Sequence, residues 1–194
     1  MKTVEPIYSS RDVEKFLEIL RAWNRNYYTA AVIGINWGLR VSDTLALKVG
    51  QLVAGTEERI QAPDMIRLNE IKTGRERCII VNRKMKKVIH EHIKHIASKA
   101  GAFDPTMPLI LSRNRGKDGK GKSLSRYALH SALKSAAQQA GIREHIGAQS
   151  LRKTFVYQAW RLGMVSGRRS IEFHQYACIP LREESEIYEL MTFA

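Results

Sequence analysis

Three basic side chains lie where helices or turns are expected to begin or end, and their types suit phosphate chemistry. Arg40 follows an expected helix end, Lys72 lies in a turn-like tetrapeptide, and Arg152 lies near an expected helix start. A guanidinium group can donate two parallel hydrogen bonds to the non-bridging oxygens of a phosphate, and an ammonium group can protonate a leaving oxygen. Taken singly, each of these residues is more often a surface ion pair or a solvated turn residue. Together they predict a site that stabilises a phosphodiester transition state.

The charge of the chain points to a polyanionic partner. Its 194 residues include 32 Lys and Arg against 19 Asp and Glu, a net charge of +13, which on a globular domain favours nucleic acid. The densest basic segment is 113–122, where three glycines separate the cations, and we interpret it as a flexible loop that lies along a DNA backbone. The predicted DNA-binding residues are Arg113, Arg115, Lys117, Lys120, Lys122 and Lys153. The alternative for this segment is a merely solvated loop.

The composition also excludes several classes of protein. An apolar fraction of 44% is enough for a packed core, and no run of apolar residues approaches the length of a membrane span. The N-terminus has no apolar signal segment, and Cys78 and Cys178 show no metal-ligand spacing, so a cytoplasmic protein with reduced thiols is expected. His90 and His95 miss the spacing of a metal pair, and no Walker-type loop occurs. We therefore expect neither a metal nor a nucleotide cofactor.

The elements that must position these residues are mainly helices. Apolar periodicity and caps predict helices that end near residues 23, 37, 98, 140 and 162, a short helix capped by Ser42 and Asp43, and an acidic helix around 183–191. Alternation predicts a β-hairpin from 66–71 and 77–81 with a cationic turn at 72–75, and a short strand at 109–111. The fold class predicted is mainly α with a small antiparallel β-sheet (α+β), as one domain over 1–194.

Three short segments resemble one known family. Gly-Leu-Arg-Val-Ser-Asp (38–43), Ile-Lys-Thr-Gly (71–74) and Ser-Leu-Arg-Lys-Thr-Phe (150–155) are similar, in this order, to the boxes of the tyrosine recombinases, or phage integrases, in their catalytic domain. The resemblance covers about residues 8–163. Because three boxes occur in the expected order, the match is more specific than any one of them.

The resemblance implies a role for each residue of the site. Arg40 and Arg152 would clamp the scissile phosphate, and Lys72 would be the general acid for the 5′-hydroxyl leaving group. The family usually has His three residues before the second arginine, where this chain has Gln149. Glutamine can donate a hydrogen bond to phosphate but cannot shuttle a proton.

The end of the chain departs from the family pattern. His174 lies 22 residues after the second arginine, where the family has His or Trp, but no tyrosine follows nine residues later. The candidate nucleophiles are Tyr188, which lies on the expected last helix, and Tyr176, only two residues beyond His174. We favour Tyr188, and a chain without a working nucleophile remains the alternative.

The sequence thus predicts the catalytic domain of a site-specific DNA recombinase or integrase that acts through a phosphotyrosyl intermediate. The resemblance implies duplex DNA as partner, a tetramer on DNA, and a role in a mobile element or plasmid. Few residues precede the first expected helix, so no N-terminal core-binding domain is expected. One alternative is a catalytically degenerate DNA-binding protein on the same scaffold. Another is a basic protein that binds RNA or an acidic protein and matches the boxes by chance.

Overall fold

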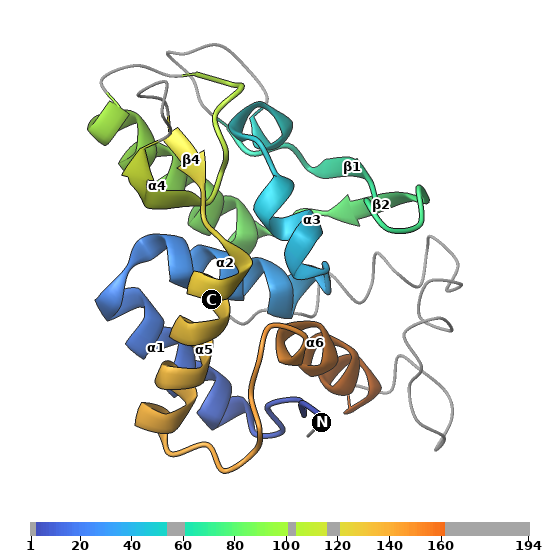
Figure 1. Cartoon of the computed structure of the whole chain (residues 1–194). Coiled ribbons are helices and arrows are strands. Elements are labelled where there is room, and N and C mark those ends of the chain that lie inside the picture. Colours follow the sequence, from blue (N-terminus) through green and yellow to red (C-terminus); the bar gives the residue numbers. More distant parts are fainter. Residues whose placement is uncertain (1–2, 54–60, 101–103, 116–120, 162–194) are drawn as a thin grey trace.

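The structure, a computed structural model, describes residues 3–53, 61–100, 104–115 and 121–161. It is mainly helical, with two small antiparallel hairpins (Figure 1), as the sequence predicted. The helices are α1 (Ser10–Trp23), α2 (Arg25–Trp37), α3 (Val41–Ala46), the 3₁₀ turn η1 (Val49–Leu52), α4 (Arg83–Ala100), α5 (Arg126–Ala140) and α6 (Ser150–Arg161). The strands are β1 (Met65–Asn69), β2 (Glu76–Ile80), β3 (Leu111–Arg115) and β4 (Gly121–Ser123).

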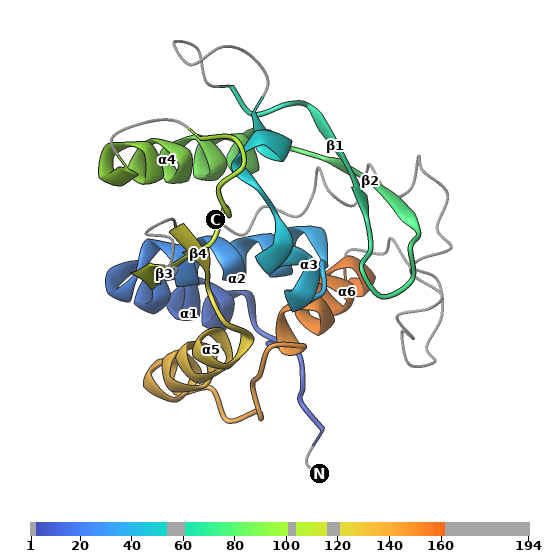
Figure 2. The ribbon, with the colours of Figure 1, turned by 45° about the horizontal axis from the view of Figure 1, so that its top comes forward.

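Helix α2 is the centre of the core. Every residue from 28 to 37 is buried, and α2 packs against α1, α3, α4, α5 and α6. Figures 1 and 2 show these helices grouped around it, with the β1–β2 hairpin at one side of the molecule beside α3. A helix that is apolar on all sides is stable only when other elements cover it. The position of α2 therefore follows from its sequence.

Helix boundaries follow the caps that the sequence carries. Ser9 caps α1 by accepting a hydrogen bond from the backbone N–H of Asp12. Gly38 ends α2 in the left-handed conformation, with φ of 60°, and Gly141 ends α5 in the same way. The structure thus confirms the helix ends predicted near residues 37 and 140, and each is followed by a glycine that caps the helix.

The predicted hairpin is present, but its turn begins two residues earlier than predicted, at residue 70 instead of 72, and ends at 75 as predicted. Strands β1 and β2 pair in register from Met65 with Ile80 to Asn69 with Glu76. Ile71, which was predicted to end the first strand, lies in the turn and is 63% exposed. The prediction was wrong there because Glu70 closes the turn: its N–H donates to the Arg75 carbonyl and its carbonyl accepts from Gly74.

Helix α3 begins earlier than predicted. Its N-cap is Arg40, which makes no side-chain capping bond, so the prediction that Ser42 and Asp43 cap this helix was wrong. The Asp43 carboxylate instead accepts a hydrogen bond from the backbone N–H of Ile71, at 3.1 Å. A contact with a distant turn has thus replaced a local cap.

The basic segment 113–122 was predicted as a flexible loop after a strand at 109–111. The structure corrects the bounds of the strand and places 113–115 and 121–122 in strands, while 116–120 lie outside the described residues. The strand is β3, at Leu111–Arg115, and it pairs with β4 to form a second hairpin. Leu109 and Ile110 are fully buried and lead into it. The apolar pair marks where the chain enters the core, and the ladder continues into the polar residues beyond because β4 supplies hydrogen-bond partners.

Among the described residues, no helix is both long and apolar enough to cross a membrane. No three His, Cys, Asp or Glu side chains in the same residues are grouped as a metal site requires. The histidine-bearing helix α4 uses His92 in the core, where its imidazole donates to the Leu109 carbonyl at 2.8 Å.

Candidate active site

Arg40 is positioned by the sharp end of α2. The left-handed Gly38 turns the chain out of the helix, and Arg40 becomes the N-cap of α3 two residues later. Its guanidinium group reaches toward the β1–β2 turn, with a quarter of the side chain exposed. Arg40 therefore lies at a junction between two helices and can still reach a ligand.

Arg152 is positioned by an unusually close approach of α6 to α2. A Cβ added at Gly34 would lie 2.8 Å from the Cβ of Leu151, and one at Gly38 would lie 2.3 Å from a ring carbon of Phe155. Gly34 and Gly38 are four residues apart, and so are Leu151 and Phe155, the side chains that pack against them. The contact therefore extends over about one turn of each helix. This contact carries Arg152, which lies between Leu151 and Phe155, beside the end of α2.

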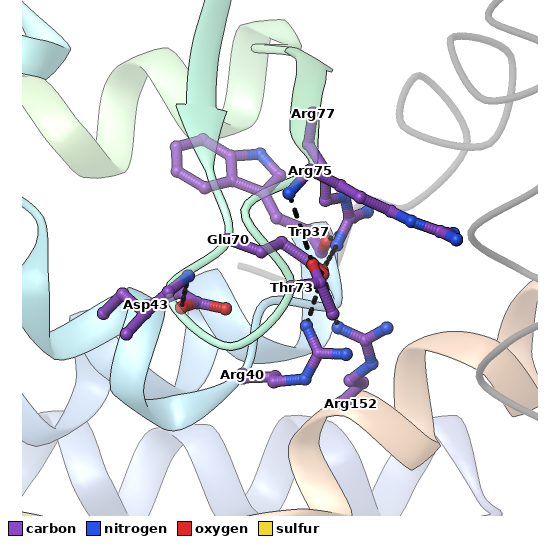
Figure 3. Close-up of polar contacts among 9 residues, drawn as sticks. Trp37, Arg40, Asp43, Glu70, Thr73, Arg75, Arg77 and Arg152 are labelled. Carbon is purple, nitrogen blue, oxygen red and sulfur yellow. Dashed lines mark hydrogen bonds and ion pairs between the residues drawn. The ribbon is translucent and has the colours of Figure 1, made fainter.

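The two arginines meet at a buried carboxylate, that of Glu70, at the end of β1 (Figure 3). Its Oε2 lies 2.5 Å from Nη1 of Arg40, and its Oε1 lies 3.5 Å from Nη1 of Arg152. Thr73 donates its hydroxyl to Oε2 at 2.7 Å. Only 4% of the Glu70 side chain is exposed. Arg40 and Arg152 are thus brought together, as predicted, although they are far apart in the sequence.

A third arginine, which the sequence analysis did not single out, joins this group. Arg77 of β2 places Nη1 3.8 Å from Oε1 of Glu70 and donates from Nη2 to the Trp37 carbonyl at 3.4 Å. Three guanidinium groups therefore surround one carboxylate, which leaves a formal excess of two positive charges. Arg77 lies opposite Leu68 in the β1–β2 ladder, and Glu70 follows the last paired residue of β1, so no local pattern in the sequence singles out either residue.

The electrostatics of the group follow from this geometry. Burial alone would raise the pKa of Glu70, but hydrogen bonds from Arg40 and Thr73 and the charges of Arg40 and Arg152 lower that pKa from 4.5 to about 2. Burial lowers the pKa of Arg152, and the charges of Arg77 and Arg40 lower it further. Glu70 is therefore an anion at neutral pH, and a guanidinium group stays protonated. The site presents a fixed positive field that suits a phosphate.

Lys72 lies in the turn that joins β1 to β2, and its side chain is exposed. Figure 2 shows this turn close to α6, in agreement with the contact between Glu70 and Arg152. Lys72 is two residues from Glu70, so the turn brings its backbone to the arginines. Its role as general acid stays a prediction.

The remaining predicted site residues divide into two groups. Gln149 is exposed and immediately precedes α6, three residues before Arg152. Lys153, predicted to bind DNA, donates its ammonium group to the Val4 carbonyl at 2.7 Å. The others lie outside the described residues: His174, Tyr176, Tyr188, Lys117 and Lys120.

The basic residues that the structure describes around 113–122 lie on the second hairpin. Arg113 and Arg115 belong to β3 and Lys122 belongs to β4. Arg113 and Lys122 are exposed. The two strands pair antiparallel, with a register shift between Leu111 and Arg115, so the phosphate contacts predicted for these residues would come from a two-stranded hairpin. Their DNA contacts stay a prediction.

Comparison with known proteins identifies the fold and the family. Residues 8–164 match the phage integrase family. A probable integrase/recombinase of Bacillus subtilis (strain 168), YoeC, is 30% identical over 161 residues, which cover 83% of this chain and 77% of the relative.

Solved structures show the same fold at low sequence identity. XerA recombinase matches with a TM-score of 0.58 at 13% identity, over 96% of this chain and 61% of that one. Lambda integrase residues 75–356 bound to DNA match with a TM-score of 0.56 at 13% identity, over 84% and 54% of the two chains. The lambda integrase catalytic core matches with a TM-score of 0.54 at 13% identity, over 83% and 89%. The first two structures are thus spanned over less than two thirds of their length. The three boxes are not a chance match, and this chain belongs to the phage integrase family.

Proposed function

We propose that this chain is the catalytic domain of a site-specific DNA recombinase that cuts and rejoins duplex DNA through a phosphotyrosyl intermediate. The observation that carries the proposal is the meeting of Arg40 and Arg152 at Glu70, beside the turn that holds Lys72. The contributing residues come from two helices and a hairpin that are distant in the sequence. Preorganised cations of this kind stabilise charge that develops on a phosphate.

The proposed reaction has one covalent step in each direction. The phenol oxygen of Tyr188 attacks phosphorus, the bond from phosphorus to the 5′-oxygen breaks, and Lys72 donates a proton to that oxygen. The phenol proton leaves to solvent, because Gln149 cannot take it up. Rejoining reverses these steps. Arg40 and Arg152 bind the non-bridging oxygens throughout.

Several finer statements belong to the same proposal. The chain functions as a single domain over 1–194 in the cytoplasm and serves a mobile element or plasmid. It acts on DNA as a homo-oligomer, a tetramer when two sites recombine. Support comes from solved relatives described as a lambda integrase dimer bound to a COC′ core site and as XerH recombinase bound to its difH substrate.

A second candidate function is a DNA-binding protein on the same scaffold that does not cleave. The observation that favours it is Gln149 at the place where the family resemblance calls for histidine. Both candidates predict binding to duplex DNA. Only the first predicts a covalent adduct.

A trapping experiment separates the two candidates. The wild-type chain is incubated with nicked duplexes of randomised sequence, in which the fragment released by cleavage is too short to stay paired, and adducts are detected on denaturing gels. We expect an adduct that Tyr188→Phe abolishes while duplex affinity is unchanged, since the substitution removes one oxygen and no positive charge. Tyr176→Phe, the matched control, should leave the adduct intact. No adduct with the wild type would establish the second candidate.

A further inference from the structure

The turn that carries Lys72 is tied to the arginine site on both sides of that lysine. On one side, the Ile71 N–H donates to the buried Asp43 carboxylate of α3 at 3.1 Å. On the other side, the Thr73 hydroxyl donates to Oε2 of Glu70 at 2.7 Å. Lys72 itself is exposed. The backbone on either side of Lys72 is therefore held, while its flexible side chain extends outward.

Glu70 is the point at which the turn and the arginines meet. Its backbone closes the turn through bonds of 2.9 Å to the Arg75 carbonyl and 2.8 Å from the Gly74 N–H. Its Oε2 receives both the Thr73 hydroxyl and Nη1 of Arg40, and Figure 3 shows these groups converging on one oxygen. A shift of the turn would therefore move the oxygen that orients Arg40.

A general acid depends strongly on such placement. Lysine carries its proton on a stem of four carbons with much rotational freedom. Proton transfer requires the ammonium group to lie within about 3 Å of the leaving oxygen, and an error of about 1 Å in such a position can reduce a rate about 100-fold. The hydrogen bond from the Thr73 hydroxyl to Glu70 restrains the residue next to Lys72. It therefore limits the backbone positions from which the Lys72 side chain can extend.

We infer that Thr73 and Glu70 form a positioning pair that fixes the Lys72 turn against Arg40 and Arg152, so that the acid and the phosphate clamp keep one geometry. The inference rests on the proposed function. It assigns a role to two residues that would not themselves touch the reacting atoms. The Thr73 hydroxyl acts through Glu70, and Glu70 acts on both the turn and the arginines.

The test compares Thr73→Val with Thr73→Ser. Valine has the shape of threonine without its hydroxyl, whereas serine keeps the hydroxyl, and position 73 is exposed, so both variants should fold. Cleavage is measured on the duplex recovered by trapping, made with either oxygen or sulfur at the bridging 5′ position. A thiolate leaves without receiving a proton because thiols are far more acidic than alcohols. The sulfur substrate therefore removes the need for the acid and keeps the need for the arginines.

We expect Thr73→Val to cleave the oxygen substrate about 10-fold or more slowly than the wild type, and to cleave the sulfur substrate within about 3-fold of it. Thr73→Ser should match the wild type on both. The inference would be overturned if Thr73→Val cleaved the oxygen substrate as fast as the wild type. It would also be overturned if Thr73→Val cleaved the sulfur substrate as slowly, relative to the wild type, as it cleaves the oxygen substrate. Absence of any wild-type adduct would overturn the proposed function, and this inference would fail with it.

Discussion

The Glu70 carboxylate offers the sharpest test of how the site is held together. Replacing Glu70 with glutamine keeps the size and shape of the side chain and removes the charge that Arg40, Arg77 and Arg152 share. The three guanidinium groups would then face one another across a neutral amide. We therefore predict that Glu70→Gln lowers the free energy of unfolding at neutral pH.

The magnitude follows from the pKa of Glu70, which falls from 4.5 to about 2 in the folded protein. A difference of about 2.5 units at 1.36 kcal/mol each corresponds to about 3 kcal/mol. Because the folded pKa lies below the unfolded pKa, this stabilisation is complete above pH 4.5 and is lost as the pH falls through 2. It is a large share of the 5–15 kcal/mol typical of a domain.

The assay is urea unfolding at pH 7 and pH 3, followed by circular dichroism. The free energy of unfolding of the wild type should exceed that of Glu70→Gln by about 3 kcal/mol at pH 7. This difference should be smaller by about 2 kcal/mol at pH 3. Glu76→Gln is the control, because Glu76 is exposed on β2 and its substitution removes the same charge. That control should stay close to wild type at both values of pH.

Two results would refute the reasoning. One is a Glu70→Gln variant as stable as wild type at pH 7. The other is a gap that does not change between pH 7 and pH 3, which would show that packing and not charge accounts for the effect.

Two further predictions concern the contact between α2 and α6 and the basic segment 113–122. Gly38→Ala should destabilise the protein by about 2 kcal/mol or more, because it combines a left-handed φ of 60° with a phenylalanine ring carbon 2.3 Å from the new Cβ. Gly141→Ala, with φ of 77° and open space around the new Cβ, should cost only about 1 kcal/mol; equal losses in urea unfolding would show that the contact between α2 and α6 is unimportant. Neutralising Arg113, Arg115 and Lys117 together should flatten the log–log salt dependence of duplex binding by up to about three, at roughly 0.9 per phosphate contact. An unchanged slope in a salt titration would mean that these side chains are only solvated.

Local patterns in the sequence determined most of the helical framework. Ser9 and Gly38 were identifiable as helix boundaries because capping depends on residues within one turn, and the structure has them there. The candidate arginines were identifiable because they lie in short boxes typical of the family. The shift of α3 was not predictable, since Asp43 has two possible partners, its own helix terminus and a turn N–H 28 residues away, and only the fold decides between them.

The centre of the site was decided by tertiary structure alone. In the sequence, Glu70 is one polar residue at the end of an alternating segment, and nothing local distinguishes it from an exposed strand residue such as Glu76. Glu70 becomes the centre of the site because folding brings Arg40 and Arg152 into contact with it, although Arg152 is 82 residues away in the sequence. A buried carboxylate needs cations or hydrogen-bond donors to offset its loss of hydration, and the three arginines around Glu70 are placed by the way α2, α6 and the hairpin pack.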